Sequence, residues 1–394
     1  MKLLLLFAFG VLSTFAEDSQ LLKEFSEGNI QFSADVYKEM LKSNSGNFLV
    51  CPLSVDIVLA LVHAGARGET AQQLSTGLHL PESHEKIEQI FTKLAPTLQS
   101  NDKYNLSSAN KVYVKDNFKI SDKFKSTAVN VFDAEIQNID FTKKEQAATE
   151  MNKWVEDKTH DKIKDLISPD DLNQYTRAVL INAIYFHGQW VKQFDEYSTR
   201  KRTFYLNAND HVETDMMEIT DSFNYYESPD LNAKFLELPY EGGDITMTFV
   251  LPNDKDGLPA LEARIDEVLA TPKYSFERVH VIIPKFKIET TIQFKPILQA
   301  LGIKDAFEDN ADFSGIGAQK EPLKISKVIQ KAFIEVEEKG TTAAAATAVM
   351  LVELASFDIP TSPPKQFVAD HPFVCYLRSS SAIIFIGRYS GLSN

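Results

Sequence analysis

The chain has 394 residues, a formal net charge of −14 and 44% hydrophobic residues. Such an acidic surface repels phosphate backbones and anionic lipid, which argues against a nucleic-acid or membrane partner. The lysines are dispersed among acidic residues, and without a basic cluster we expect no heparin-type site.

Residues 1–16 have the features of a secretory signal peptide. Lys2 precedes an apolar run, Leu3–Leu12, and the small residues Thr14 and Ala16 flank Phe15. A basic start, a short apolar core and small residues before the cut are typical of a cleaved leader, and the run is too short to cross a bilayer. A buried N-terminal segment is the alternative. We therefore expect a secreted, extracellular monomer whose mature chain, 17–394, is a single domain, because no linker or repeat divides it.

Helical patterns dominate the first half of the chain. Apolar residues recur at helical spacing, and proline stands at a helix start where its missing N–H costs little. The predicted helices are 21–41, 52–66, 70–78, 83–98 and 146–167. Two short segments, 111–114 and 118–120, are strand-like.

Strand patterns dominate the second half. Val179–Phe186 is continuously apolar but for Asn182, which is typical of a strand buried on both faces. The predicted strands are 177–187, 235–240, 246–252, 279–288, 324–336, 373–378 and 382–389, and helices are predicted at 257–269 and 294–301. Helices first and strands later indicate an α+β fold.

No catalytic or metal-binding pattern stands out. There is no Gly-x-Ser-x-Gly motif, and His84-Glu85 lacks the second histidine of a zinc-protease helix because position 88 is Glu88. The eight histidines lack metal-ligand spacing. We therefore expect neither an enzyme nor a metal or cofactor.

Two cysteines and one sequon bear on the extracellular environment. Cys51 and Cys375 lie in apolar surroundings, so we expect buried free thiols, with a single long-range disulfide as the alternative. Asn105 begins the only glycosylation sequon, which is usable only if it is exposed.

The segment after Val336 has an unusual composition. Glu338, Lys339 and Gly340 precede a run of small residues: Thr341, Thr342, Ala343, Ala344, Ala345, Ala346, Thr347 and Ala348. In a strand, alternate residues face the same way, so neither face of this run would block insertion between two existing strands. Gly340 supplies the backbone freedom of a hinge. A buried alanine-rich helix and a flexible linker are the alternatives, but β-prone Val349–Val352 and prolines at 360, 363 and 364 argue against a helix.

The chain resembles the serpins, a family of serine-protease inhibitors, and most closely the insect haemolymph members. The hinge Glu338–Thr347 carries most of this resemblance. Further matching motifs are Asn47–Val55, Gly65–Thr70, Asn182–Trp190, Asp312–Gly315 and the C-terminal part from Asp370–Phe373 through Gly387-Arg388. The joint match of these separated motifs covers essentially the whole mature chain.

The resemblance implies a fold of three β-sheets with about nine helices, a metastable native state and an exposed reactive-centre loop, about 338–364. It implies a suicide substrate: a protease cleaves the loop, forms an acyl-enzyme, and is trapped when the loop inserts into the main sheet. A non-inhibitory carrier or storage protein of the same fold is the alternative.

The family register places the scissile bond at Leu354–Ala355, although a longer following segment leaves Phe357 and Ile359 open. No lysine or arginine lies between Gly340 and Pro364. Trypsin-like enzymes need a basic side chain for their specificity pocket, so we expect chymotrypsin-like or elastase-like targets.

Two further regions follow from the resemblance. Ser54, Asn182 and Gln330 fall on the shutter, beneath the point where strands part. The family often has serine where this chain has Cys51 and histidine where it has Gln330, which alters this polar network. The second region is the breach, where the loop enters the main sheet. There we expect a Lys285–Glu338 salt bridge beside Trp190.

Overall fold

The computed structural model describes residues 2–98, 100–243, 245–270, 272–317, 323–341 and 363–391. Within these ranges the chain forms two β-sheets and nine α-helices. The helices are α1 Lys2–Leu41, α2 Pro52–Gly65, α3 Gly68–Gly77, α4 His84–Leu94, α5 Asp122–Phe132, α6 Lys144–Lys158, α7 Leu258–Glu262, α8 Ile265–Leu269 and α9 Phe294–Ala300. Both the α+β class and the number of helices agree with expectation.

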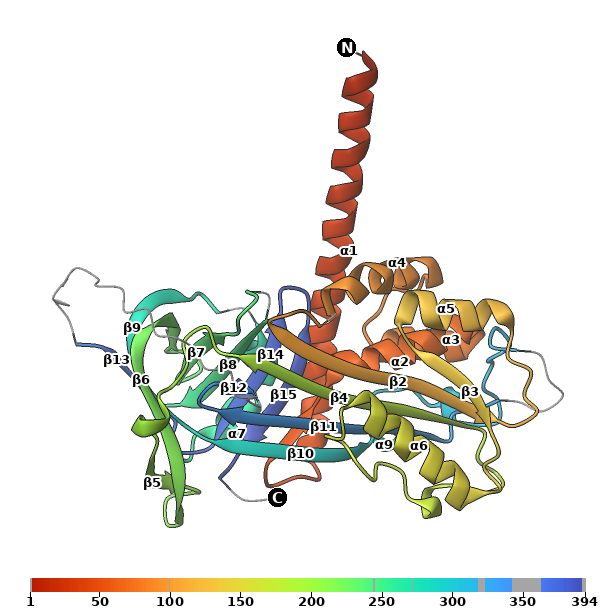
Figure 1. The fold of residues 1–394 in the computed structure, drawn as a ribbon. Coiled ribbons are helices and arrows are strands. Elements are labelled where there is room, and N and C mark those ends of the chain that lie inside the picture. Colours follow the sequence, from red (N-terminus) through yellow and green to blue (C-terminus); the bar gives the residue numbers. More distant parts are fainter. Residues whose placement is uncertain are drawn as a thin grey trace.

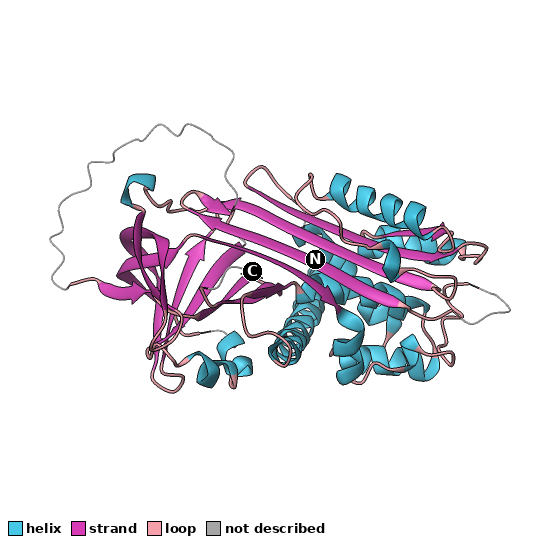
Figure 2. Cartoon of the chain, turned by 90° about the horizontal axis from the view of Figure 1, so that it is seen from below, coloured by secondary structure: helices cyan, strands magenta, loops and turns pink. Residues whose placement is uncertain are grey.

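A six-stranded sheet crosses the middle of the molecule, and its long strands are visible in both Figure 1 and Figure 2. Its order is β10 (Phe286–Gln293), β11 (Lys327–Glu337), β12 (Gly340–Thr341), β4 (Ala178–Gln189), β2 (Tyr104–Lys115), β3 (Glu135–Ile139). Successive residues of β4 point to opposite faces, and both faces are buried. One face packs into the main core with α2, and the other packs under α6.

The remaining strands form a nine-stranded sheet. Its path is β1 (Phe48–Val50), β15 (Ile383–Tyr389), β14 (Phe373–Ser379), β8 (Ile245–Pro252), β7 (Ala233–Pro239), β6 (His211–Ser228), β9 (Ser275–Pro284), β13 (Lys365–Val368), with β5 (Arg200–Tyr205) paired to β6. Three sheets were expected. The described strands give two hydrogen-bonded sheets because 18-residue β6 is continuous. It pairs with β5 over 211–216, with β9 over 216–225 and with β7 over 224–228.

Several element boundaries differ from the sequence prediction. The helix predicted over 146–167 ends at Lys158, because His160 and Asp161 adopt positive φ. The strand predicted over 279–288 is two strands, β9 and β10, in different sheets. Helix α5 was not predicted, although Ser121 caps its N-terminus by accepting a hydrogen bond from Phe124 N. Residues 118–120 form only an isolated bridge, from Ile120 to Gly317.

The N-terminal segment is helical from Lys2, so α1 continues through the predicted signal cleavage point; cleavage after residue 16 stays a prediction. Within the described residues, no helix combines the length and apolarity that crossing a membrane requires.

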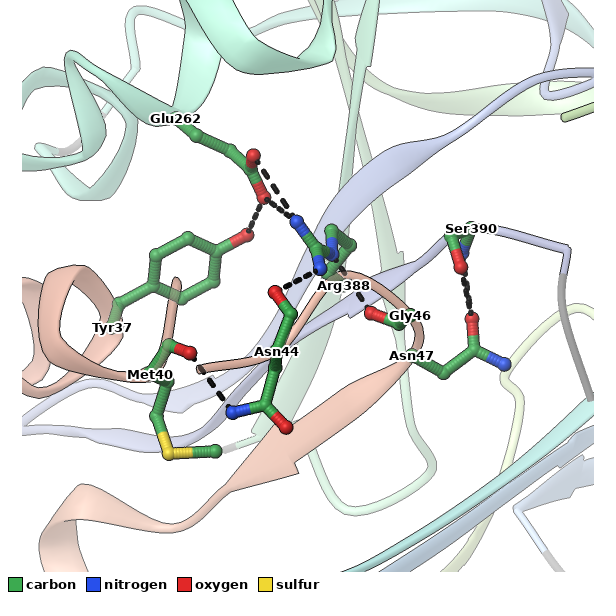
Figure 3. A network of polar contacts seen from close by, with 8 residues as sticks. All are labelled: Tyr37, Met40, Asn44, Gly46, Asn47, Glu262, Arg388 and Ser390. Carbon is green, nitrogen blue, oxygen red and sulfur yellow. Dashed lines mark hydrogen bonds and ion pairs between the residues drawn. The ribbon is translucent and has the colours of Figure 1, made fainter. Parts of the chain in front are cut away.

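A buried polar network joins the end of α1 to α7 and β15 (Figure 3). Arg388 Nη1 lies 3.2 Å from Glu262 Oε1, and both side chains are less than one-tenth exposed. Tyr37 donates to Glu262 over 2.8 Å, and the remaining guanidinium nitrogens donate to the carbonyls of Asn44 and Gly46. These bonds compensate the buried charges, so segments far apart in the chain are held together.

Candidate functional site

The six-stranded sheet is parted at one end by the start of the alanine-rich segment. Strands β4 and β11 pair directly and in parallel from Val179↔Lys327 to Tyr185↔Phe333. Beyond this point β12 lies between them, with Gly340 opposite Gln189 on one side and Glu337 on the other. The chain therefore reverses after β11 and places two residues inside the sheet.

Gly340 is required at this reversal. Its φ is +150°, and a Cβ added there would meet Gly188 O at 2.0 Å. The next residue, Thr341, is completely buried, and its hydroxyl lies 2.7 Å from the hydroxyl of Tyr240. The Tyr240 ring in turn stacks on Trp190, with ring centroids 4.2 Å apart. A large or charged side chain at position 341 would therefore have to displace a packed aromatic pair.

The ion pair expected at the breach is present. Lys285 Nζ lies 2.9 Å from Glu338 Oε2, and the Glu338 side chain is 8% exposed. Thr199 Oγ1 donates to the other carboxylate oxygen over 2.8 Å. Burial alone would raise the pKa of Glu338, but the bonds from Lys285, from the backbone N–H of Glu338 itself and from Thr199 outweigh it, so that its pKa is lowered.

Trp190 lies at the same place and binds the backbone of the turn. Its indole Nε1 donates to Glu337 O over 2.9 Å, and its backbone N–H donates to Lys339 O over 2.9 Å. Three consecutive residues, 337–339, are thus tied to the segment after β4, because Phe194 N also donates to Glu338 O. The contacts of Thr199, Phe194 and Tyr240 were not foreseen from the sequence.

The shutter residues meet below the parting of the strands, and all three are fully buried. Asn182 donates to Asn110 Oδ1 over 2.6 Å and to Ser54 O over 3.1 Å, and it also contacts the Ser54 hydroxyl. Gln330 Nε2 donates to Asn182 Oδ1 over 2.6 Å, which links β11 to β4. The network therefore joins β4 to β11 where the two strands pair directly, below the point at which β12 lies between them.

Gln330 also binds the backbone on both sides of Cys51. Its Nε2 donates to Cys51 O over 2.8 Å, and its Oε1 accepts from Cys51 N over 2.9 Å. Residue 51 therefore joins the network through its peptide groups, which bind Gln330, and its thiol interacts with Ser54. Sequence reasoning missed this contact and the role of Asn110, because both depend on strand register.

The cysteines are free and buried, as expected. Burial raises the pKa of both thiols, that of Cys375 to about 12, so neither is poised to react.

Asn105 lies in β2, half-buried, and its Oδ1 accepts from Ser100 and Ser107; its glycosylation stays a prediction. The hinge residues 342–347, Leu354, Ala355 and the alternatives Phe357 and Ile359 lie outside the described residues.

Comparison with known proteins agrees with this geometry. The family model described as "Serpin (serine protease inhibitor)" matches residues 27–391. Antichymotrypsin-2 of Bombyx mori is 38% identical over 92% of this chain and 96% of its own length; antitrypsin of the same species is 36% identical over 96% and 97%. The crystal structure of Serpin48 from Tenebrio molitor has a TM-score of 0.88 and 42% identity, covering 94% of this chain and 99% of that one.

The chain therefore belongs to the serpin family. It is a serine-protease inhibitor by family and not an enzyme, and insect serpins are among its similar relatives.

Proposed function

We propose that this serpin is a secreted, monomeric suicide substrate for serine proteases of chymotrypsin-like or elastase-like specificity. The observation that carries the proposal is β12: Gly340 and Thr341 already form a two-residue strand between β4 and β11. A loop that begins inside the sheet needs only to continue in the same direction to insert fully.

The register of β12 defines where each further residue would go. If Gly340 stays opposite Gln189 and Glu337, residue 347 falls between Asn182 and Gln330, and residue 350 falls between Val179 and Lys327. Insertion as far as residue 350 would therefore replace every direct β4–β11 pair by two new strand pairings. Each backbone hydrogen bond gained contributes about 0.5–1.5 kcal/mol net.

The same register explains the small side chains. Residues of the same parity as Thr341 would face the main core, opposite buried residues such as Phe186, Ile184 and Ile334. The inserted strand would have to share this close-packed space, and alanine or threonine fits where a larger residue would overpack it. Thr347 would arrive at the Asn182–Gln330 hydrogen bond with a hydroxyl that can bond to both partners.

The proposed chemistry is an interrupted proteolysis. The protease serine attacks the carbonyl of Leu354, the peptide bond to Ala355 breaks, and the new amine of Ala355 leaves with the proton that the protease histidine supplies. The acyl-enzyme ester then remains on Leu354. Insertion of the freed loop carries the protease along before water hydrolyses the ester.

The target class rests on the absence of basic residues between Gly340 and Pro364. Similarity to relatives named antichymotrypsin and antitrypsin does not separate the classes, because the two names imply different targets. The loop composition therefore carries this part of the proposal.

The test is incubation with chymotrypsin, pancreatic elastase and trypsin, followed by denaturing gels and sequencing of the released peptide. We expect SDS-resistant complexes with the first two enzymes and a C-terminal peptide that begins at Ala355. Thr341→Arg should be cleaved without forming a complex, whereas Thr341→Ser, the matched control, should still form one. Cleavage of the unmodified protein without any complex would refute inhibition. A released peptide that starts at another residue would show that the scissile bond is not Leu354–Ala355.

A further inference from the structure

Strand β13 (Lys365–Val368) follows the reactive-centre loop and holds its distal end. Among the described strands it pairs only with β9, in parallel over four residues, and it is the last strand of its sheet. Figure 1 shows β13 with β5, β6 and β9 at one end of the molecule. A short edge strand has few backbone bonds, so side-chain contacts weigh heavily in keeping it in place.

A series of polar contacts crosses the outer face of these four strands and ends at the loop. Arg202 on β5 pairs with Glu218 on β6. Glu218 Oε1 lies 2.7 Å from His280 Nε2 on β9, and His280 Nδ1 lies 2.9 Å from Gln366 Oε1 on β13. Gln366 Nε2 then donates to Pro364 O over 3.2 Å.

The hydrogen bonds that this arrangement can form depend on the charge of His280. The carbonyl of Pro364 can only accept, so the amide of Gln366 must turn its Nε2 toward it and its Oε1 toward His280. The other ring nitrogen faces the carboxylate of Glu218. All of these hydrogen bonds can form together only when both ring nitrogens donate, as in the protonated imidazolium. A neutral ring would leave two acceptors facing each other or would force the amide to turn and lose Pro364.

Some of the surrounding charges favour the imidazolium form of His280, and others oppose it. Glu218 favours the imidazolium, and the hydrogen bond from His280 is the main reason that the pKa of Glu218 is lowered, with Arg202 adding to it. Arg202 on β5, which pairs with Glu218, opposes a further positive charge, and Arg278 lies on the same face of β9 two residues before His280. On β7, Lys234 Nζ donates to Gln366 O over 3.2 Å, and on β6 Glu227 lies 3.5 Å from Lys365 Nζ. The last two contacts hold β13 whatever the charge on His280.

We propose that His280 is a pH-dependent fastening of β13, which holds the distal end of the reactive-centre loop firmly when protonated and more weakly when neutral. Histidine ordinarily changes charge between about pH 5 and 8, so the fastening weakens as the pH rises through this range. The consequence for inhibition rests on the proposed function: an uncut loop freed at β13 could insert without a protease, and inhibitory activity would be lost.

The test is hydrogen exchange of residues 365–368 in the full chain, with protection factors corrected for intrinsic exchange, measured from pH 5 to 8. We expect protection to fall roughly tenfold across this range as one hydrogen bond is lost. His280→Gln should show low protection that does not vary with pH. His211→Gln, an exposed histidine of the same sheet, is the control and should follow the unmodified protein.

Two further variants should move the transition in opposite directions. Gln366→Glu adds a second carboxylate beside the imidazolium and should shift the fall in protection to higher pH, whereas Glu218→Gln should shift it to lower pH. A His280→Gln profile identical to that of the unmodified protein would overturn the proposal. Because exchange needs no protease, pH-dependent protection in a protein that inhibits nothing would leave this fastening intact and refute the proposed function instead.

Discussion

Replacing Glu338 by lysine should open the end of the six-stranded sheet. The carboxylate is nearly buried and accepts bonds from Lys285 and Thr199. A hydrogen bond to a charged group contributes about 1.5–3 kcal/mol. Because the Lys285 side chain is 36% exposed and water screens it, the lower part of that range applies, about 2 kcal/mol. Glu338→Lys also sets two ammonium groups side by side.

A loss of about 2 kcal/mol raises the population of the opened sheet roughly thirtyfold. An opened sheet can accept the loop of another molecule, and because such a contact is head-to-tail it does not close, so chains of molecules form. We therefore expect Glu338→Lys to have a lower Tm and to form polymers on native gels after mild heating, under conditions that leave the unmodified protein monomeric.

Two controls separate the ion pair from a general charge effect. The charge-reversed double variant, Lys285→Glu with Glu338→Lys, should recover much of the Tm and suppress polymers, because it restores an ion pair at the same place. Glu82→Lys makes the same charge change at an exposed position before α4 and should behave as the unmodified protein. If Glu338→Lys stays monomeric after heating and has the Tm of the unmodified protein, the Lys285–Glu338 ion pair does not hold this end of the sheet closed.

Three further substitutions test other parts of the structure. Gln330→Ala removes the bonds that Gln330 makes to Asn182 Oδ1 and to the Cys51 peptide groups, and it should lower the free energy of unfolding by about 2–4 kcal/mol in urea titrations; an unchanged midpoint would contradict this. Burial raises the pKa of Asp56 well above its usual value, so the folded protein keeps this proton to a higher pH than the unfolded chain does, and the free energy of unfolding should fall as pH rises above about 4. Asp56→Asn should remove that part of the fall, and parallel pH profiles would count against it. Arg388→Met leaves the buried Glu262 without its ion-pair partner and should lower the free energy of unfolding by about 3–5 kcal/mol, measured in urea (Figure 3). A Tm equal to that of the unmodified protein would disprove this.

Much of the fold followed from local patterns. The proline at the start of α2, the apolar run of β4 and the late strands were predicted close to their positions. The errors occurred where local signals were weak or tertiary contacts decided. Residues 275–293 give no sign that the chain passes from one sheet to another at Pro284–Phe286, because both halves are equally strand-like.

By itself, the sequence determined the chemistry of the loop: small side chains after Gly340, no basic residue before Pro364, and the separated motifs of the family. These properties reside in consecutive residues, since side-chain size and backbone freedom need no distant partner. Only the tertiary structure decided which groups meet, such as Gln330 with the peptides of Cys51, or His280 with Glu218 and Gln366. Those contacts join segments far apart in the chain, and packing of the whole core sets how the segments align.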